Sequence, residues 1–125
     1  MTSEVGGLGW AFEGRILDAV GLISPEFLRY HPLPIPEARI GGSTGAIPVA
    51  AVVESAPDLL VSIEVFSEAV RRAMANGQLD DYTLLQREPV LSDRIVPNVT
   101  HYRLWNSRYT EVYIHERLRN GHSTP

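Results

Sequence analysis

The segment Arg15–Pro25 constrains the fold of this chain more than any other stretch. Its first residues, Arg15–Asp18, are typical of a short buried strand that ends in a carboxylate. Gly21 then permits a sharp bend, and Ser24 before proline is typical of a helix start, because serine caps helices and proline suits their first turn. A strand that leads through a polar residue and a bend into a helix forms one edge of a crevice in an open α/β sheet.

Helices and strands are also predicted along the rest of the chain. The segment Leu59–Val65 is apolar and rich in β-branched residues, as expected of a central strand that is covered on both faces. We therefore expect buried side chains along it, at Leu60, Val61, Ile63 and Val65. The other predicted elements are helices at Pro25–Tyr30, Ile47–Ala56 and Glu68–Asn76, and strands at Tyr82–Glu88, His101–Asn106 and Thr110–Leu118.

The last two strands alternate like a hairpin that turns near Ser107–Tyr109. A register with residue 104 opposite 112 places the apolar side chains on one face and His101 beside His115. The predicted fold is therefore α/β: one domain over residues 1–125 with a small mixed sheet, helices packed on it, a Rossmann-like half and a terminal hairpin. The polar residues 120–125 are expected to form a frayed tail.

Composition narrows the possible partners and cofactors. The net charge is −4, and the 11 basic residues, all arginines, are scattered apart from Arg71-Arg72, so we expect no nucleic-acid partner. The chain has no cysteine, which excludes disulfides and thiolate ligands. Phe12 stands where a dinucleotide-binding fingerprint beginning at Gly7 needs its third glycine, and the histidines lack a third metal ligand. We therefore predict no cofactor and no metal.

Two acidic residues lie in or beside the predicted apolar strands and are candidate ligand-binding residues, namely Asp18 and Glu64. Carboxylates at strand ends can line a crevice in an α/β sheet. Asp18 could equally accept hydrogen bonds from the backbone of the Gly21 bend. The sequence leaves both interpretations open.

The loop Gly41–Gly45 matches the G-x-S-x-G pattern of a nucleophile elbow, with Ser43 as the nucleophile. That motif needs a preceding strand, and Pro34–Pro36 is a poor strand. The same loop precedes a predicted helix, so the backbone amides of Gly42, Ser43 and Thr44 could instead bind an anion, although the lysine of a P-loop is missing.

Three segments together resemble a known family: Glu4–Trp10, Arg15–Pro25 and Pro57–Val61. They are similar to the soluble C-terminal tail of bacterial polytopic membrane proteins of the dolichyl-phosphate-mannose mannosyltransferase and lipid-linked aminoarabinose transferase group. The family pattern is roughly E-I-G-x-L-G-Y, then I-x-D-x-x-G-L-x-S-P, then P-D-Y-[IV]-V. Leu59 replaces the usual aromatic residue of the third motif, and the loop 31–45 does not align.

The resemblance implies a non-catalytic domain on the extracytoplasmic face of a bacterial membrane. It would be attached through membrane spans outside this sequence, and it would contact the membrane-embedded remainder of the same protein, with an acceptor or glycan as a further contact. In such transferases the catalytic acid lies between early membrane spans, so no catalytic role passes to this chain. An apolar strand precedes the E-I-G turn in this family, and only Met1–Ser3 precede it here. We therefore expect an exposed sheet edge beside Ile16–Asp18, which could support a homodimer.

Two other functions remain open from the residues alone. One is a free-standing α/β module that binds a small anionic ligand near Asp18 and the loop Gly41–Gly45. The other is a serine hydrolase that uses Ser43.

The isolated chain is predicted to have no transferase or hydrolase activity. A fluorophosphonate probe, which labels activated serines, should therefore leave the purified chain unlabelled. Stoichiometric labelling that disappears in Ser43→Ala would contradict this prediction and favour the hydrolase.

Overall fold

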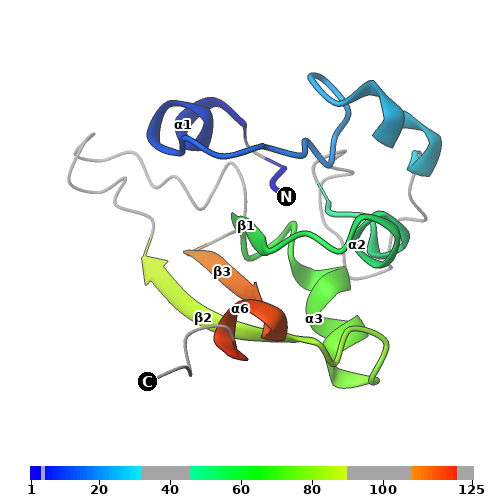
Figure 1. The fold of residues 1–125 in the computed structure, drawn as a ribbon, viewed down its shortest axis with the longest axis vertical. Coiled ribbons are helices and arrows are strands. Elements are labelled where there is room, and N and C mark those ends of the chain that lie inside the picture. The colour runs from blue at the N-terminus through cyan, green and yellow to red at the C-terminus, as the bar shows by residue number, and fades with distance from the viewer. Residues whose placement is uncertain (4, 32–45, 90–107, 121–125) are drawn as a thin grey trace.

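A three-stranded antiparallel sheet forms the centre of the structure, a computed structural model that describes residues 1–3, 5–31, 46–89 and 108–120 (Figure 1). The strands are β1 (Leu59–Ile63), β2 (Tyr82–Pro89) and β3 (Tyr109–His115), in the spatial order β1-β3-β2. In the register of the sheet, Val112 of β3 lies opposite Val61 of β1 on one side and Gln86 of β2 on the other. The β2–β3 pairing shifts between residues 84 and 86.

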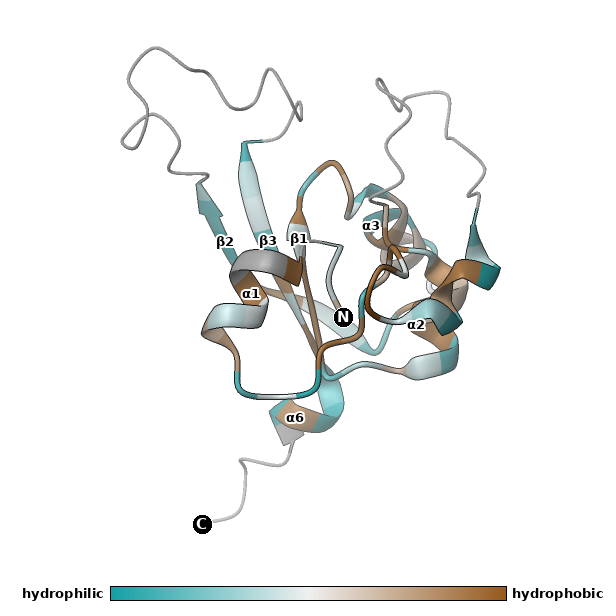
Figure 2. Cartoon of the chain, turned by 90° about the horizontal axis from the view of Figure 1, so that it is seen from above, coloured by the Kyte–Doolittle hydropathy of each residue, from teal (hydrophilic) through white to brown (hydrophobic). Residues whose placement is uncertain are grey.

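Helices pack on this sheet and confirm the predicted α/β class. In Figure 2 the two helices α2 and α3 lie beyond β1, and α1 lies in front of the sheet. The helices are α1 (Val5–Ala11), the 3₁₀ helix η1 (Pro25–Tyr30), α2 (Val49–Ser55), α3 (Glu68–Ala75) and α6 (Glu116–Asn120). The named strands all pair antiparallel, and the Rossmann-like half is not confirmed.

Most predicted local elements occur within a few residues of their expected bounds, and the differences have backbone causes. The helix α2 begins only at Val49, because Pro48 is extended and the Ile47 amide donates to the carbonyl of Phe66. The strand β1 ends at Ile63, because the amides of Phe66 and Ser67 turn back to its carbonyl. Gly77 follows α3 with a φ of +79°, as expected of a glycine after a helix C-terminus.

The N-terminal residues pair with the sheet, which corrects the expectation of a missing neighbour beside Ile16–Asp18. Thr2 forms parallel bridges to both Asp18 and Val61. Its amide donates to the carbonyl of Leu17 at 3.0 Å, and its carbonyl accepts from Ala19 at 2.8 Å. The predicted strand at Arg15–Asp18 is therefore reduced to one bridge, and Met1–Ser3 occupy the place that we expected to be empty.

The predicted terminal hairpin is wrong in its partners. Over Tyr109–His115, one edge of β3 pairs with β1 and the other with β2, so neither edge is left for residues 101–106. In place of the predicted register, Ile114 lies opposite Leu59 and Thr83. After His115 the chain turns into α6, where we expected the strand to continue to Leu118. The predicted strand His101–Asn106 itself lies outside the described residues.

The hydrophobic core lies where the sheet, the helices α2 and α3, and the N-terminal segment meet. Leu60 and Ile63 of β1 are buried as predicted, whereas Val61 and Val65 are half-buried. The main cluster contains Leu60 and residues from widely separated parts of the described chain. Besides Leu60, its members are Met1, Ala19, Phe27, Ile47, Ala51, Val52, Val70, Ala73, Leu79, Tyr82 and Tyr113.

Truncation of Leu60 tests this arrangement. Its side chain has no solvent exposure, so Leu60→Ala should lower the free energy of unfolding by roughly 2–5 kcal/mol through lost burial and a cavity. Leu85→Ala is the matched control on β2, where leucine is 56% exposed, and should cost less than about 0.5 kcal/mol. Urea unfolding of both variants measures the difference. Equal effects would contradict the position of β1 in the core.

Candidate functional site

Asp18 is buried and organises the loop that follows it. Its side chain is 1% exposed, and its carboxylate accepts hydrogen bonds from the amides of Val20 and Ile23, each at 2.9 Å. The amide of Gly21 donates to the Asp18 carbonyl at 3.1 Å. Of the two interpretations left open by the sequence, the structure supports hydrogen bonding to the bend.

Ser24 closes the same loop. We had expected the Ser24 hydroxyl to cap η1, but it makes no capping hydrogen bond. Instead, its oxygen accepts a hydrogen bond from the Asp18 amide at 3.1 Å. Gly21 has a φ of +91°, and a side chain there would also collide with Leu28. The backbone angle therefore requires glycine, and a larger residue would also force Leu28 to move. The loop is fixed by its own polar groups.

Glu64 also holds backbone rather than a ligand. Its Oε2 atom accepts from the amides of Arg108 and Tyr109 at 3.1 and 3.0 Å, where β3 begins, and lies 3.7 Å from Arg87. Asp18 and Glu64 share no hydrogen-bond partner among the described residues, so their contacts do not bring them together in one crevice. The other candidates, Gly42, Ser43 and Thr44, lie outside the described residues, and their role stays a prediction.

A charged groove that we did not predict lies beside α3 and has a volume of about 510 Å³. Its central residue is Glu111, which is 2% exposed. The Glu111 carboxylate lies 2.6 Å from Arg71 and 3.4 Å from Arg87, and accepts a hydrogen bond from the Tyr113 hydroxyl at 2.7 Å. Met74 and Leu84 complete the lining.

The groups in this groove already satisfy one another. Burial raises the pKa of Tyr113, and its hydrogen bond to Glu111 raises it further, so the hydroxyl stays protonated and donates. Arg71 also donates to the carbonyl of Glu64, while Arg87 stacks 4.0 Å from the ring centre of Tyr109. The cluster links α3, β2 and β3. Side chains alternate between the two faces of a strand, so residues 111 and 113 of β3 lie on the same face. This alternation in the sequence was the available indication that Glu111 is buried together with Tyr113.

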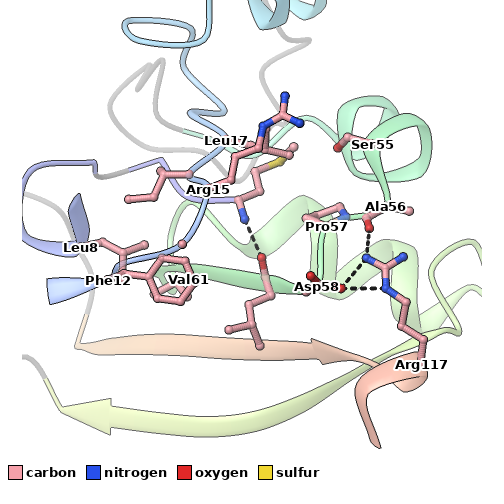
Figure 3. Close-up of a pocket in the computed structure, with 14 residues that line it drawn as sticks. Leu8, Phe12, Arg15, Leu17, Ser55, Ala56, Pro57, Asp58, Val61 and Arg117 are labelled. Atoms are coloured by element: carbon pink, nitrogen blue, oxygen red, sulfur yellow. Dashed lines mark hydrogen bonds and ion pairs between the residues drawn. The ribbon is translucent and has the colours of Figure 1, made fainter. Parts of the chain in front are cut away.

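A second pocket, of about 380 Å³, opens between α1 and β1 (Figure 3). Its walls are mostly apolar, and Figure 3 shows Leu8 and Phe12 turned toward Val61. The polar or charged side chains of its lining are those of Arg15, Ser55, Asp58 and Arg117. The other lining residues are Met1, Gly14, Ile16, Leu17, Ala56, Pro57 and Leu59.

An ion pair holds one side of this pocket. Arg117 of α6 donates from Nε to Asp58 at 2.7 Å and also donates to the carbonyl of Ala56. Ala56 ends α2 in the left-handed conformation, with a φ of +39°, where glycine is more usual. The Met1 nitrogen donates to the Leu59 carbonyl at 2.6 Å.

Sequence reasoning missed this pocket because its residues come from distant segments. Within the described residues, no three histidine or acidic side chains gather as a metal site would require. None of the helices in the described ranges combines the length and apolar character of a membrane span.

No protein-family model, curated protein or solved structure matches the chain.

Replacement of Asp18 tests its structural role. Asp18→Ala leaves the amides of Val20 and Ile23 without their acceptor, and should lower the free energy of unfolding by roughly 1–3 kcal/mol. Asp80→Ala removes an exposed carboxylate and is the control, with an expected change below about 0.5 kcal/mol. Thermal or urea unfolding decides. An Asp18→Ala chain as stable as the parent would show that the loop does not depend on the carboxylate.

Proposed function

We propose that this chain is a non-catalytic, extracytoplasmic domain of a bacterial membrane-bound glycosyltransferase-like protein. In this proposal it docks on the membrane-embedded remainder of the same protein, and an acceptor or glycan is a second contact. The observation that carries the proposal is the loop Asp18–Ser24. This loop belongs to the segment that resembles the tails of such transferases. It exposes apolar side chains, and its backbone is held by hydrogen bonds to the Asp18 carboxylate.

The exposed residues of this loop are Leu22 and Ile23, with side chains 79% and 61% exposed. Single exposed leucines are ordinary on protein surfaces, and they need no explanation. Here two adjacent apolar residues are exposed, and the Ile23 amide is itself fixed by the Asp18 carboxylate. Leu28, also exposed, packs against Gly21 beside them. We call Leu22, Ile23 and Leu28 the loop tip.

An apolar partner would gain from covering the loop tip. Burial of a leucine or isoleucine side chain contributes about 1.5–3 kcal/mol, and a loop that is already ordered loses little further entropy on docking. The Asp18 carboxylate and the Ser24 hydroxyl already accept hydrogen bonds within the loop, so the partner does not have to supply hydrogen bonds to these two groups. Such a surface suits a membrane-embedded partner better than a polar one.

The coding sequence upstream of Met1 is the first test. In the same reading frame it should encode several apolar segments long enough to cross a membrane. A stop codon directly upstream in that frame, with translation that starts at Met1, would overturn the proposal.

Thiol accessibility tests the location and the docking surface separately. Because the chain has no cysteine, an introduced Ile23→Cys is the only thiol of the domain, and Asp80→Cys supplies a matched exposed thiol away from the loop tip. In intact cells that make the complete protein, a membrane-impermeant maleimide should label Asp80→Cys without lysis. It should label Ile23→Cys at least about tenfold more slowly, which corresponds to about 1.4 kcal/mol of protection.

In the isolated 125-residue chain, both thiols should react at similar rates, because nothing covers the loop tip there. Labelling of Asp80→Cys only after lysis would contradict the extracytoplasmic location. Equal rates at both positions in the complete protein would contradict docking through the loop tip.

A further inference from the structure

We propose that the pocket between α1 and β1 binds a small amphipathic anion, which has an apolar body and one negatively charged head such as a carboxylate. The proposal rests on the lining of the pocket and on the charges at its edge. It does not depend on the function proposed above, and its test can fail while the other succeeds.

The apolar walls define the body of the ligand. Apolar residues from three separate segments line the space: Leu8 and Phe12 from α1 and its C-terminal end, Ile16 and Leu17 from the following segment, and Leu59 and Val61 from β1. A volume of about 380 Å³ lies within the range of small-molecule sites, which are mostly apolar with a few polar groups that fix orientation. An apolar ligand would remove these walls from water.

The charged side chains of the lining define the head of the ligand. Asp58 is paired with Arg117, so these two charges offset each other. Arg15 also lines the pocket, and among the described residues it has no hydrogen-bond or ion-pair partner. The three side chains together leave one net positive charge. A guanidinium binds a planar carboxylate with good geometry, so an anionic head is favoured over a cationic one.

This side of the pocket is already in place before a ligand arrives. Arg117 is held at two points, by the Asp58 carboxylate and by the Ala56 carbonyl. The left-handed backbone of Ala56 is unfavourable for a residue with a side chain, and such strain is concentrated at functional sites. By contrast, both arginines of the Glu111 groove are paired with carboxylates, so that groove offers no free charge.

Methyl NMR with decanoate tests the proposal. Titration of the 125-residue chain should produce saturable shifts at Leu8, Leu17 and Val61, and none at the exposed Leu84 and Leu118. Decyltrimethylammonium, with the same apolar chain and the opposite charge, should bind about threefold more weakly, as expected of one exposed charge contact. Arg15→Gln should abolish this difference and leave stability unchanged, because Arg15 is exposed and has no hydrogen-bond or ion-pair partner within the described part of the chain.

A second variant tests the apolar part of the site. Leu8→Trp fills the pocket from α1 and should weaken decanoate binding, whereas Leu118→Trp on α6, outside the lining, should not. A thermal melt shows whether each variant is folded, and if Leu8→Trp is not, the Arg15→Gln comparison still decides. Shifts that do not saturate and that spread over Leu22, Leu84 and Leu118 would overturn the proposal. Equal affinity of the parent chain for decanoate and decyltrimethylammonium would overturn it as well.

Discussion

The parallel pairing of Thr2 connects the two halves of this structure. Its backbone lies between β1 and the segment at Asp18, and it is bonded to Leu17 and Ala19 on one side. On the other side, the Val61 amide donates to the Met1 carbonyl at 3.0 Å. These few bonds bring α1 over β1 and so create the pocket, and they also fix the point from which the loop Asp18–Ser24 begins. Together with the bond from the Met1 nitrogen to the Leu59 carbonyl, they join the N-terminal segment, residues 1–31, to the sheet (Figure 1).

Buried polar groups explain why the most obvious candidate residues serve structure. A buried carboxylate is costly unless it is hydrogen-bonded or paired. Asp18 meets this requirement with two backbone amides, and Glu111 meets it with two arginines and a tyrosine. Glu64 binds the amides at the start of β3. Each carboxylate is already satisfied by the chain, so a ligand would have to displace these contacts.

The loop tip and the pocket both involve the N-terminal segment, residues 1–31. The loop tip includes Ile23, whose amide is held by the Asp18 carboxylate. The pocket is lined in part by residues that precede Asp18 in the chain, from Leu8 to Leu17. The two features differ in chemistry. The loop tip is apolar and exposed, as an apolar partner requires, whereas the pocket combines apolar walls with Arg15, which has no ion-pair partner among the residues that the structure describes. The two proposals are therefore compatible, and their tests separate them.

Local patterns in the sequence determined the short-range structure. The β-branched run at Leu59–Ile63, the helix Glu68–Ala75 with its following Gly77, and the bend at Asp18–Gly21 were all predictable, because each depends on neighbours within a few residues. The sequence did not determine which strands pair. A terminal hairpin was equally consistent with the alternation of residues 109–115, and only packing against both β1 and β2 selected the observed register. The burial of Glu111, the pairing of Thr2 and the pocket from Leu8 to Arg117 are likewise decided by tertiary structure, because each joins residues that are far apart in the chain.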